Sequence, residues 1–297
     1  MKILFLGDHG PTNIRSTKDG LIIGDASPVP PPDFAYDTIL IGNTKGFVSY
    51  AALKTLGKWG ITVGLLGRSG TPLATFVPWA RNDAPLRLAQ MQAALDEGRR
   101  VQVARAILEA KIGQRVPRDV RAVRDLRGYE SKVAQVYWNA LGVNRLSGYY
   151  KTLHAKATTS VNAAINYAQG VHAVLCRRMI SLVGLDPAVG FLHHATYDKD
   201  AFVYDWQELA RQVVDREAIA FARETPAAFL RDEDWVYRLK NNAAKQLALQ
   251  TGEALSRKIS YHGERATIET VLTGELRKLG GWFRKPTGSL SLHAIPA

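Results

Sequence analysis

The spacing of apolar residues changes near residue 80, and this change constrains the fold of the chain more than any other feature. Before that point, short runs such as "KILFLG", "YDTILIG" and "GITVGLLG" are bounded by glycine, aspartate or proline, which is typical of β-strands. One segment, "SYAALKTLGKWG" from Ser49, instead has a serine in a capping position and helical apolar spacing. From about Leu86 onward, apolar residues recur every three or four positions, as in "VARAILEAKI".

The two patterns predict an α+β protein with two domains. We expect a small β-rich N-terminal domain over residues 1–85 and a larger, all-helical domain over residues 86–297, with the boundary between Pro78 and Leu88. A chain of 297 residues is long enough to form two separate cores. We expect the helices of the second domain to be interrupted by proline or glycine at Pro117, Gly128, Pro187, Pro226 and Gly280–Gly281.

The charge of the chain indicates a polyanionic partner. The formal net charge is +12 and the isoelectric point is about 9.8, which favours nucleic acid over a membrane surface. The segment from Arg99 to Arg127 contains eight arginines and one lysine but only three acidic residues. The guanidinium fork suits phosphate oxygens, so we predict a DNA-binding role for this segment, as a basic stripe if it is helical. Its regularly spaced members are Arg115, Arg118, Arg121 and Arg124.

Several kinds of protein are excluded or disfavoured by the composition. Cys176 is the only cysteine, which rules out an intrachain disulfide and a cysteine-based zinc site. No apolar run approaches the roughly 20 residues of a membrane-spanning helix. The start, "MKILFLGDHG", is too short in apolar residues for a signal peptide and is interpreted as a first strand. We therefore expect a cytoplasmic protein with no membrane partner.

Three segments of the helical part carry side chains suited to chemistry. In "LRGYESKVAQVYW" we expect Glu130 in the first turn of a helix, where a glutamate most often only interacts with the helix dipole. In "AFVYDWQELARQVV", Asp205 and Glu208 would share one helix face, flanked by Arg211. Two like charges at that spacing repel each other, and a bound cation would remove this cost. Such pairs also occur on ordinary solvated faces.

The third segment, "GFLHHATYDKD", contains two adjacent histidines, His193 and His194. Neighbouring side chains of an extended segment face opposite ways, so only one of them can serve a given site. Two or three carboxylates with one imidazole would form a hard site of mostly oxygen ligands that suits Mg²⁺ or Mn²⁺. Such ions support phosphoryl transfer, which beside an arginine-rich surface indicates a nucleic-acid phosphodiester as substrate.

The order of these segments resembles the CRISPR-associated adaptation integrases, a family of integrases and endonucleases that insert new spacers into CRISPR arrays. The resemblance is carried by "LRGYESKVAQVYW", then "VNAAINYAQGVHAVL", then "PAVGFLHHATYDKDAFVYDWQELAR". The family shows a glycine-x-glutamate segment, an asparagine-alanine helix, a glycine-phe-x-histidine segment and an Asp-x-x-Asp/Glu helix in this order. "ILEAKIGQ" and the stretch from "YDTILIG" to "GLLGRSG" are similar to its linker helix and N-terminal core.

The resemblance implies metal ligands at Glu130, His193 and Glu208, with Asp205 as their acidic partner one turn earlier. Many members have aspartate at the position of Glu208, and many have aspartate at the position of Thr159. No role in the family corresponds to His194. Besides the four regularly spaced arginines we predict Arg211 as a DNA-binding residue.

The resemblance also implies the reaction and the partners. A divalent metal, Mg²⁺ or Mn²⁺, would align a DNA 3′-hydroxyl for attack on a phosphodiester of the CRISPR repeat. The expected partners are double-stranded DNA (protospacer and repeat), a second copy of the chain in a homodimer, and a small second adaptation protein that bridges dimers. Transesterification needs no nucleotide energy source, and the chain has no GxxxxGK[ST] phosphate loop.

Three alternatives remain open on the sequence. A mobile-element integrase of the same superfamily would use the same chemistry, usually with an extra C-terminal DNA-binding module, and the end at Ala297 disfavours it as an expectation. A structure-specific repair nuclease would share the metal site without the second adaptation protein. A non-catalytic DNA-binding module would bind DNA without any metal-dependent activity.

Overall fold

The structure is a computed structural model that describes residues 1–7, 12–42, 45–78, 83–143, 157–193, 199–232 and 236–296. Its chain divides into two compact units, each assembled from three segments. The first unit contains Met1–Trp79, Tyr149–Val174 and Glu217–Ala254, and the second contains Ala80–Gly148, Leu175–Arg216 and Leu255–Ala297. The first break coincides with the change in apolar spacing. The assignment of residues 1–85 and 86–297 as domains remains a prediction.

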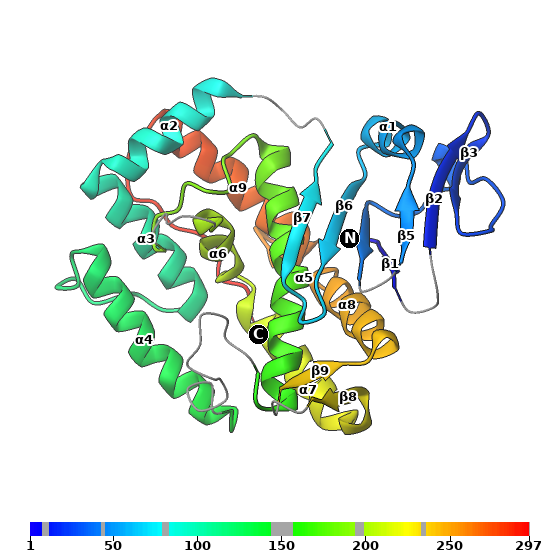
Figure 1. The fold of residues 1–297 in the computed structure, drawn as a ribbon. Helices are drawn as coiled ribbons and strands as arrows, with labels where there is room; N and C mark the ends of the chain where they lie inside the picture. The colour runs from blue at the N-terminus through cyan, green and yellow to red at the C-terminus, as the bar shows by residue number, and fades with distance from the viewer. Residues whose placement is uncertain are drawn as a thin grey trace. The chain divides into compact units, whose positions relative to one another are not determined.

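The N-terminal part of the first unit is β-rich, as its sequence predicts. A four-stranded sheet has the order β1-β4-β6-β7, in which the first three strands are parallel and β7 is antiparallel to β6 (Figure 1). Its strands are β1 (Ile3–Leu6), β4 (Thr38–Ile41), β6 (Thr62–Leu66) and β7 (Pro72–Phe76). A second sheet has the order β3-β2-β5, from β2 (Thr12–Thr17), β3 (Gly20–Ile23) and β5 (Gly46–Val48).

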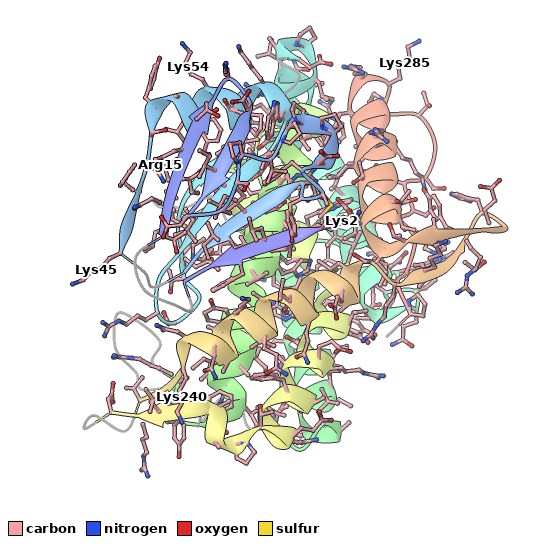
Figure 2. The ribbon with its side chains drawn as sticks, turned by 90° about the vertical axis from the view of Figure 1, so that its right-hand side faces the viewer. Lys2, Arg15, Lys45, Lys54, Lys240 and Lys285 are labelled. Atoms are coloured by element: carbon pink, nitrogen blue, oxygen red, sulfur yellow. The ribbon has the colours of Figure 1, made fainter. Side chains whose placement is uncertain are left out.

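Helix α1 (Tyr50–Trp59) begins where the sequence predicts. The side chain of Ser49 accepts a hydrogen bond from the backbone N–H of Ala52, and Gly60 ends the helix in the left-handed region at a φ of 72°. On β2, Ile14 is buried and the neighbouring Arg15 is exposed, the alternation of a strand with one buried face (Figure 2). The core of this part is apolar, made of Leu6, Ile14, Leu21, Ile39, Ala52, Leu56, Ile61 and Val63.

The remainder of the chain is mainly helical. Its helices are α2 (Ala84–Leu95), α3 (Glu97–Ile112), α4 (Val123–Ala140), α5 (Ser160–Val183), α6 (Ala201–Gln207), α7 (Arg211–Glu224), α8 (Asn241–Leu255) and α9 (Ile268–Arg284). Thr159 precedes α5 and its hydroxyl accepts the N–H of Asn162 at 3.1 Å. Threonine thus caps this helix at the position where the resemblance implies an aspartate in many members.

The prediction that this part is all-helical is wrong. It contains two antiparallel hairpins, β8 (Phe229–Arg231) with β9 (Tyr237–Leu239) and β10 (Lys258–Tyr261) with β11 (Glu264–Thr267). The second hairpin turns through His262 and Gly263, both with positive φ (51° and 87°), as a two-residue turn between twisted strands requires. The apolar alternation of strands of only three or four residues does not stand out from the helical spacing around them.

Two of the predicted helix breaks are also wrong. Gly128 lies inside α4, and Gly280–Gly281 lie inside α9. A single glycine costs a helix only about 1 kcal/mol relative to alanine, which buried neighbours such as Leu126 readily offset. The other breaks, at Pro117, Pro187 and Pro226, lie outside the α-helices.

Gly170 and Gly128 give opposite predictions for substitution by alanine. A Cβ on Gly170, within α5, would lie 1.8 Å from the carbonyl oxygen of Gly70, whereas a Cβ on Gly128 would have no neighbour within 4 Å. We expect Gly170→Ala to destabilise the protein by about 1–3 kcal/mol through overpacking. Gly128→Ala should stabilise it by about 0.5–1 kcal/mol through helix propensity. Urea unfolding measures both, and equal effects would contradict the close packing of α5 on the β6–β7 turn.

Candidate active site

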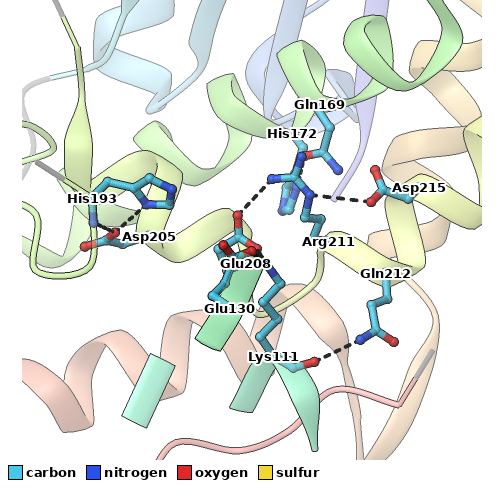
Figure 3. Close-up of polar contacts among 10 residues, drawn as sticks. All are labelled: Lys111, Glu130, Gln169, His172, His193, Asp205, Glu208, Arg211, Gln212 and Asp215. Atoms are coloured by element: carbon cyan, nitrogen blue, oxygen red, sulfur yellow. Dashed lines mark hydrogen bonds and ion pairs between the residues drawn. The ribbon is translucent and has the colours of Figure 1, made fainter. Parts of the chain in front are cut away.

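A pocket of about 190 Å³ in the second unit is lined by the three side chains that the resemblance implies as metal ligands. Glu130 comes from α4, His193 from the segment before α6, and Glu208 from the position that ends α6 (Figure 3). The same pocket is lined by Lys111 of α3 and by Tyr137 of α4. Side chains separated by up to 97 positions therefore share one small cavity.

Asp205 holds the histidine segment in place. It is fully buried, and its carboxylate accepts the backbone N–H groups of Phe191, Leu192 and His193 at 2.5, 3.1 and 2.8 Å. The same carboxylate lies 2.7 Å from Nδ1 of the His193 ring. With Nδ1 bound in this way, Nε2 is the ring nitrogen left for the pocket, which is how a carboxylate orients a ligating histidine.

The electrostatics of His193 follow from this contact. Burial by itself lowers the pKa of the imidazole, but the hydrogen bond and charge of Asp205, with smaller contributions from Glu208 and Glu130, outweigh it and raise the pKa above its usual value. Asp205 was expected to be the acidic partner of the ligands, orienting Glu208 or a bound water. Its carboxylate instead binds the backbone of residues 191–193 and the imidazole of His193, so Asp205 and Glu208 have different tasks.

Glu130 is not at a helix start. Helix α4 begins at Val123, which places Glu130 two turns inside it, so the expected interaction with the helix N-terminus is wrong. Gly128 does not interrupt the helix, and for this reason the helix begins earlier than predicted. At this position in α4, the half-buried side chain of Glu130 contacts the ammonium of Lys111.

Glu208 is the most buried acid of the pocket, with 4% of its side chain exposed. Its Oε1 accepts a hydrogen bond from Arg211 at 2.8 Å, and its Oε2 lies 2.5 Å from the ammonium of Lys111. Burial alone would raise the pKa of Glu208, but the charges of Arg211 and Lys111 outweigh it and lower the pKa to about 2. Glu208 is therefore ionised throughout the physiological range.

Lys111 was not among the residues singled out from the sequence, although a signal exists. It lies at helical spacing from Ala104, Ile107 and Leu108 of α3, all fully buried, so a lysine interrupts an apolar stripe. Burial lowers the pKa of its ammonium, and the attraction of Glu208 and Glu130 more than offsets this, so the pKa is raised. Lys111 is a buried cation between two carboxylates.

The pocket residues fit a divalent metal in their chemistry. Two carboxylates and an imidazole match the hard donors that Mg²⁺ and Mn²⁺ take, and the ammonium of Lys111 already lies against both Glu130 and Glu208. The hydroxyl of Tyr137 is buried there, and no hydrogen-bond partner for it lies among the residues that the structure describes. Within the described ranges, however, no three His, Cys, Asp or Glu side chains are already placed to hold one ion together.

The predicted DNA-binding arginines are not on one helix. Arg115, Arg118 and Arg121 lie in the irregular segment between α3 and α4, and Arg124 lies in the first turn of α4, so a helical stripe is ruled out. Pro117 excludes a continuous helix here. The four side chains are exposed; that of Arg115 also pairs with Glu109 at 2.8 Å.

Arg211 has a different setting from these four. Besides Glu208 it contacts Asp215, with 3.5 Å between Nε and Oδ2, and 29% of its side chain is exposed. It forms ion pairs with Glu208 of the pocket and with Asp215, and its binding to DNA remains a prediction. His194 lies outside the described residues. No described helix is both long and apolar enough to cross a membrane.

Comparison with known proteins places the chain in a family. The profile described as "CRISPR associated protein Cas1" matches residues 34–121 and 114–251. A CRISPR-associated endonuclease Cas1 of Pyrobaculum aerophilum is 28% identical over 207 residues, which cover 61% of this chain and 69% of that protein. The match to the enzyme of the same name from Archaeoglobus fulgidus is 27% identical over 170 residues and spans 54% of this chain but only 49% of the relative.

Solved structures share the fold over nearly the whole chain. A casposase bound to its integration product is 26% identical, has a TM-score of 0.85, and is matched over 98% of this chain and 93% of its own. The Cas1 protein of Thermotoga maritima is 18% identical, with a TM-score of 0.75 and coverage of 99% and 100%. With the profile match over more than half of its residues, the chain belongs to the CRISPR-associated Cas1 family.

Proposed function

We propose that this protein is a divalent-metal-dependent DNA integrase and endonuclease that inserts new spacers into a CRISPR array. Membership of the Cas1 family, whose relatives are named endonucleases, supports DNA integrase or nuclease chemistry. The observation that carries the finer proposal is the convergence of Glu130, His193 and Glu208 on one pocket around a buried cation.

Glu130, His193 through Nε2, and Glu208 would hold the metal, Mg²⁺ or Mn²⁺. When bound, the ion would lower the charge repulsion between a DNA 3′-hydroxyl oxygen and the phosphodiester that it attacks. The chain's own residues supply the rest. Asp205 fixes the ring of His193, Arg211 fixes Glu208, and the buried hydroxyl of Tyr137 is free to donate to a phosphate oxygen.

The reaction is a balanced exchange. The 3′-oxygen of the incoming DNA forms a bond to phosphorus while the bond to the 3′-oxygen of the cut strand breaks, and the proton of the attacking hydroxyl passes to the leaving oxygen through solvent. Water in place of the hydroxyl gives hydrolysis, so the same site accounts for an endonuclease.

The proposed partners follow relatives named in the comparisons. One solved structure is described as a Cas1–DNA complex, matched over 97% of this chain at 18% identity with a TM-score of 0.67. Another is described as a Cas6-RT-Cas1–Cas2 complex, matched over 99% of this chain at 16% identity with a TM-score of 0.74. For this chain we propose double-stranded DNA, a homodimer, a small bridging adaptation protein and a cytoplasmic location. Residues 1–85 would contribute to dimerisation and contact DNA ends.

A strand-transfer assay tests this function. The purified protein, with and without the small adaptation protein encoded beside it, is mixed with a labelled duplex and a plasmid that carries the neighbouring repeat. We expect covalent joining with Mg²⁺ or Mn²⁺, no joining with a chelator, and no joining when the duplex ends in 3′-dideoxynucleotides. Metal-dependent cutting without joining would favour a repair nuclease, and DNA binding without either would favour a non-catalytic module.

A second candidate is favoured by one comparison. The casposase, whose structure holds an integration product, has a TM-score of 0.85 at 26% identity, which supports a mobile-element integrase with the same chemistry. Duplexes that end in the inverted repeats flanking the gene, joined to targets without a CRISPR repeat, would support this candidate. Joining that requires the repeat and the adaptation protein would exclude it.

The segment with Arg118 and Arg124 gives a prediction on DNA binding. Both side chains are exposed, so each should neutralise a phosphate without reading sequence. Each phosphate contact steepens the dependence of log K on log[salt] by about 0.9 for duplex DNA, so Arg118→Glu with Arg124→Glu should weaken binding to all sequences and flatten the slope by about 2.

Fluorescence anisotropy over a range of salt concentrations measures that slope. Charge reversal of Lys258 and Lys285, two exposed lysines outside both residues 1–85 and the segment with Arg118 and Arg124, changes the net charge equally and serves as the control. Equal effects of the two double variants would show that only the overall charge matters.

A further inference from the structure

Lys111, near the end of α3, places a charged side chain in a largely buried position between two carboxylates. Its side chain is 10% exposed, and its ammonium contacts Oε1 of Glu130 and lies 2.5 Å from Oε2 of Glu208. Oε2 of Glu208 is buried, and its contact with the ammonium of Lys111 is an ion pair. An ammonium placed between two converging carboxylate oxygens occupies the position that a metal with these ligands would take.

The backbone of Lys111 is fixed, which leaves only the side chain free to move. Its carbonyl oxygen accepts a hydrogen bond from Nε2 of Gln212 at 3.0 Å, and Gly113 ends α3 in the left-handed region at a φ of 68°. Lys111 also lines a second cavity of about 470 Å³ in the same unit, together with Gly113, Gln212 and Ile295. A second open volume therefore adjoins this residue.

We propose that Lys111 is an internal cation that occupies the metal position between Glu130 and Glu208 and is displaced when the divalent ion binds. This inference rests on the proposed function. In a buried pocket the ammonium and a divalent ion repel each other strongly, so the two carboxylates hold one of them at a time. The lysine keeps the two glutamates from repelling each other in the metal-free protein. It also raises the apparent dissociation constant of the metal, because only molecules in which the ammonium has left the site can bind the ion.

Calorimetric titration with MnCl₂ in the absence of DNA tests the proposal. Lys111→Met keeps the length of the side chain and removes its charge. If the ammonium occupies the site nine times in ten, the dissociation constant of Mn²⁺ should fall about tenfold in this variant. Lys132→Met, at an exposed position of α4, is the matched control and should bind Mn²⁺ as the wild type does.

Melting temperatures with and without Mn²⁺ provide a second test of the role of Lys111. Without metal, Lys111→Met should melt at a lower temperature than the wild type, because two carboxylates lose their cation. Saturating Mn²⁺ should raise its melting temperature by more than it raises that of the wild type. If Lys111→Met does not fold without metal, Lys111→Arg, which retains the charge, should fold and bind Mn²⁺ no more tightly than the wild type.

The outcomes separate this inference from the proposed function. Equal Mn²⁺ affinity in the wild type and Lys111→Met, or weaker binding in the variant, would overturn the role of Lys111 while the metal site stands. Failure of the wild type and of Lys111→Met to bind Mn²⁺ would overturn the metal site itself, and the role of Lys111 with it. A Lys111→Arg variant that binds Mn²⁺ about tenfold more tightly than the wild type would also overturn the inference.

Discussion

Replacing Glu208 by glutamine is expected to reduce strand transfer by about 10³-fold or more while DNA binding persists. The carboxylate is buried, ionised and directed at the pocket cation, so the amide keeps its shape but not its charge. Binding to DNA should remain or improve, because the removal of a negative charge lowers the repulsion of an incoming phosphate. Gel assays of joined product and anisotropy measure the two effects separately.

Glu130→Ala and His193→Ala should have losses of similar size. Because the three side chains would hold one ion, a double variant should be little worse than either single one. Glu253→Gln, at an exposed position of α8, is the matched control and should be fully active. His194→Ala is expected to cost little. An inactive His194→Ala beside a normally active His193→Ala would refute the choice of ligand.

Asp205→Ala should destabilise the fold by about 3–5 kcal/mol, because it leaves buried groups without their partner. The carboxylate is fully buried and accepts three consecutive backbone N–H groups as well as the imidazole of His193. Asp205→Asn retains the shape and one acceptor oxygen, so it should cost less in stability and in activity than the alanine variant. Urea unfolding at neutral pH measures the difference, and equal stability of all three proteins would show that the segment of residues 191–193 is held by other contacts.

The same contact sets a pH dependence. Because the pKa of His193 is raised, its pairing with Asp205 stabilises the fold fully below the unfolded value of 6.5, and this stabilisation is lost as the pH rises through the higher folded pKa. A metal needs the neutral ring, so strand transfer should rise with pH over the same interval. In Asp205→Asn the pKa of His193 should fall, and the acidic limb of the rate profile should move to lower pH. An unchanged limb would show that another group controls it.

Local features of the sequence predicted the β-rich N-terminal part, helix α1 and the mainly helical character of the rest of the chain correctly. Ser49 caps α1 through contacts within three residues, and the apolar spacing of α3 and α5 is internal to each helix. The β10–β11 hairpin could have been predicted as well, since "KISYHGERAT" has a His-Gly pair between two short runs. The start of α4 was expected too late in the chain, because glycine is a local signal for a helix break. The packing of the buried Leu126 outweighs the small cost of Gly128 inside this helix.

The sequence by itself, through its resemblance to a known family, determined which residue types could form the pocket and gave Glu130, His193 and Glu208 as candidates. Only the tertiary structure decided that Asp205 binds the backbone of residues 191–193 and that Lys111 lies between the two glutamates. Helical spacing depends on neighbours three or four positions away, so one sequence window is enough to detect it. The contact of Lys111 with Glu208 joins residues 97 positions apart, and it depends on how α3, α4 and α6 pack, which no local pattern encodes.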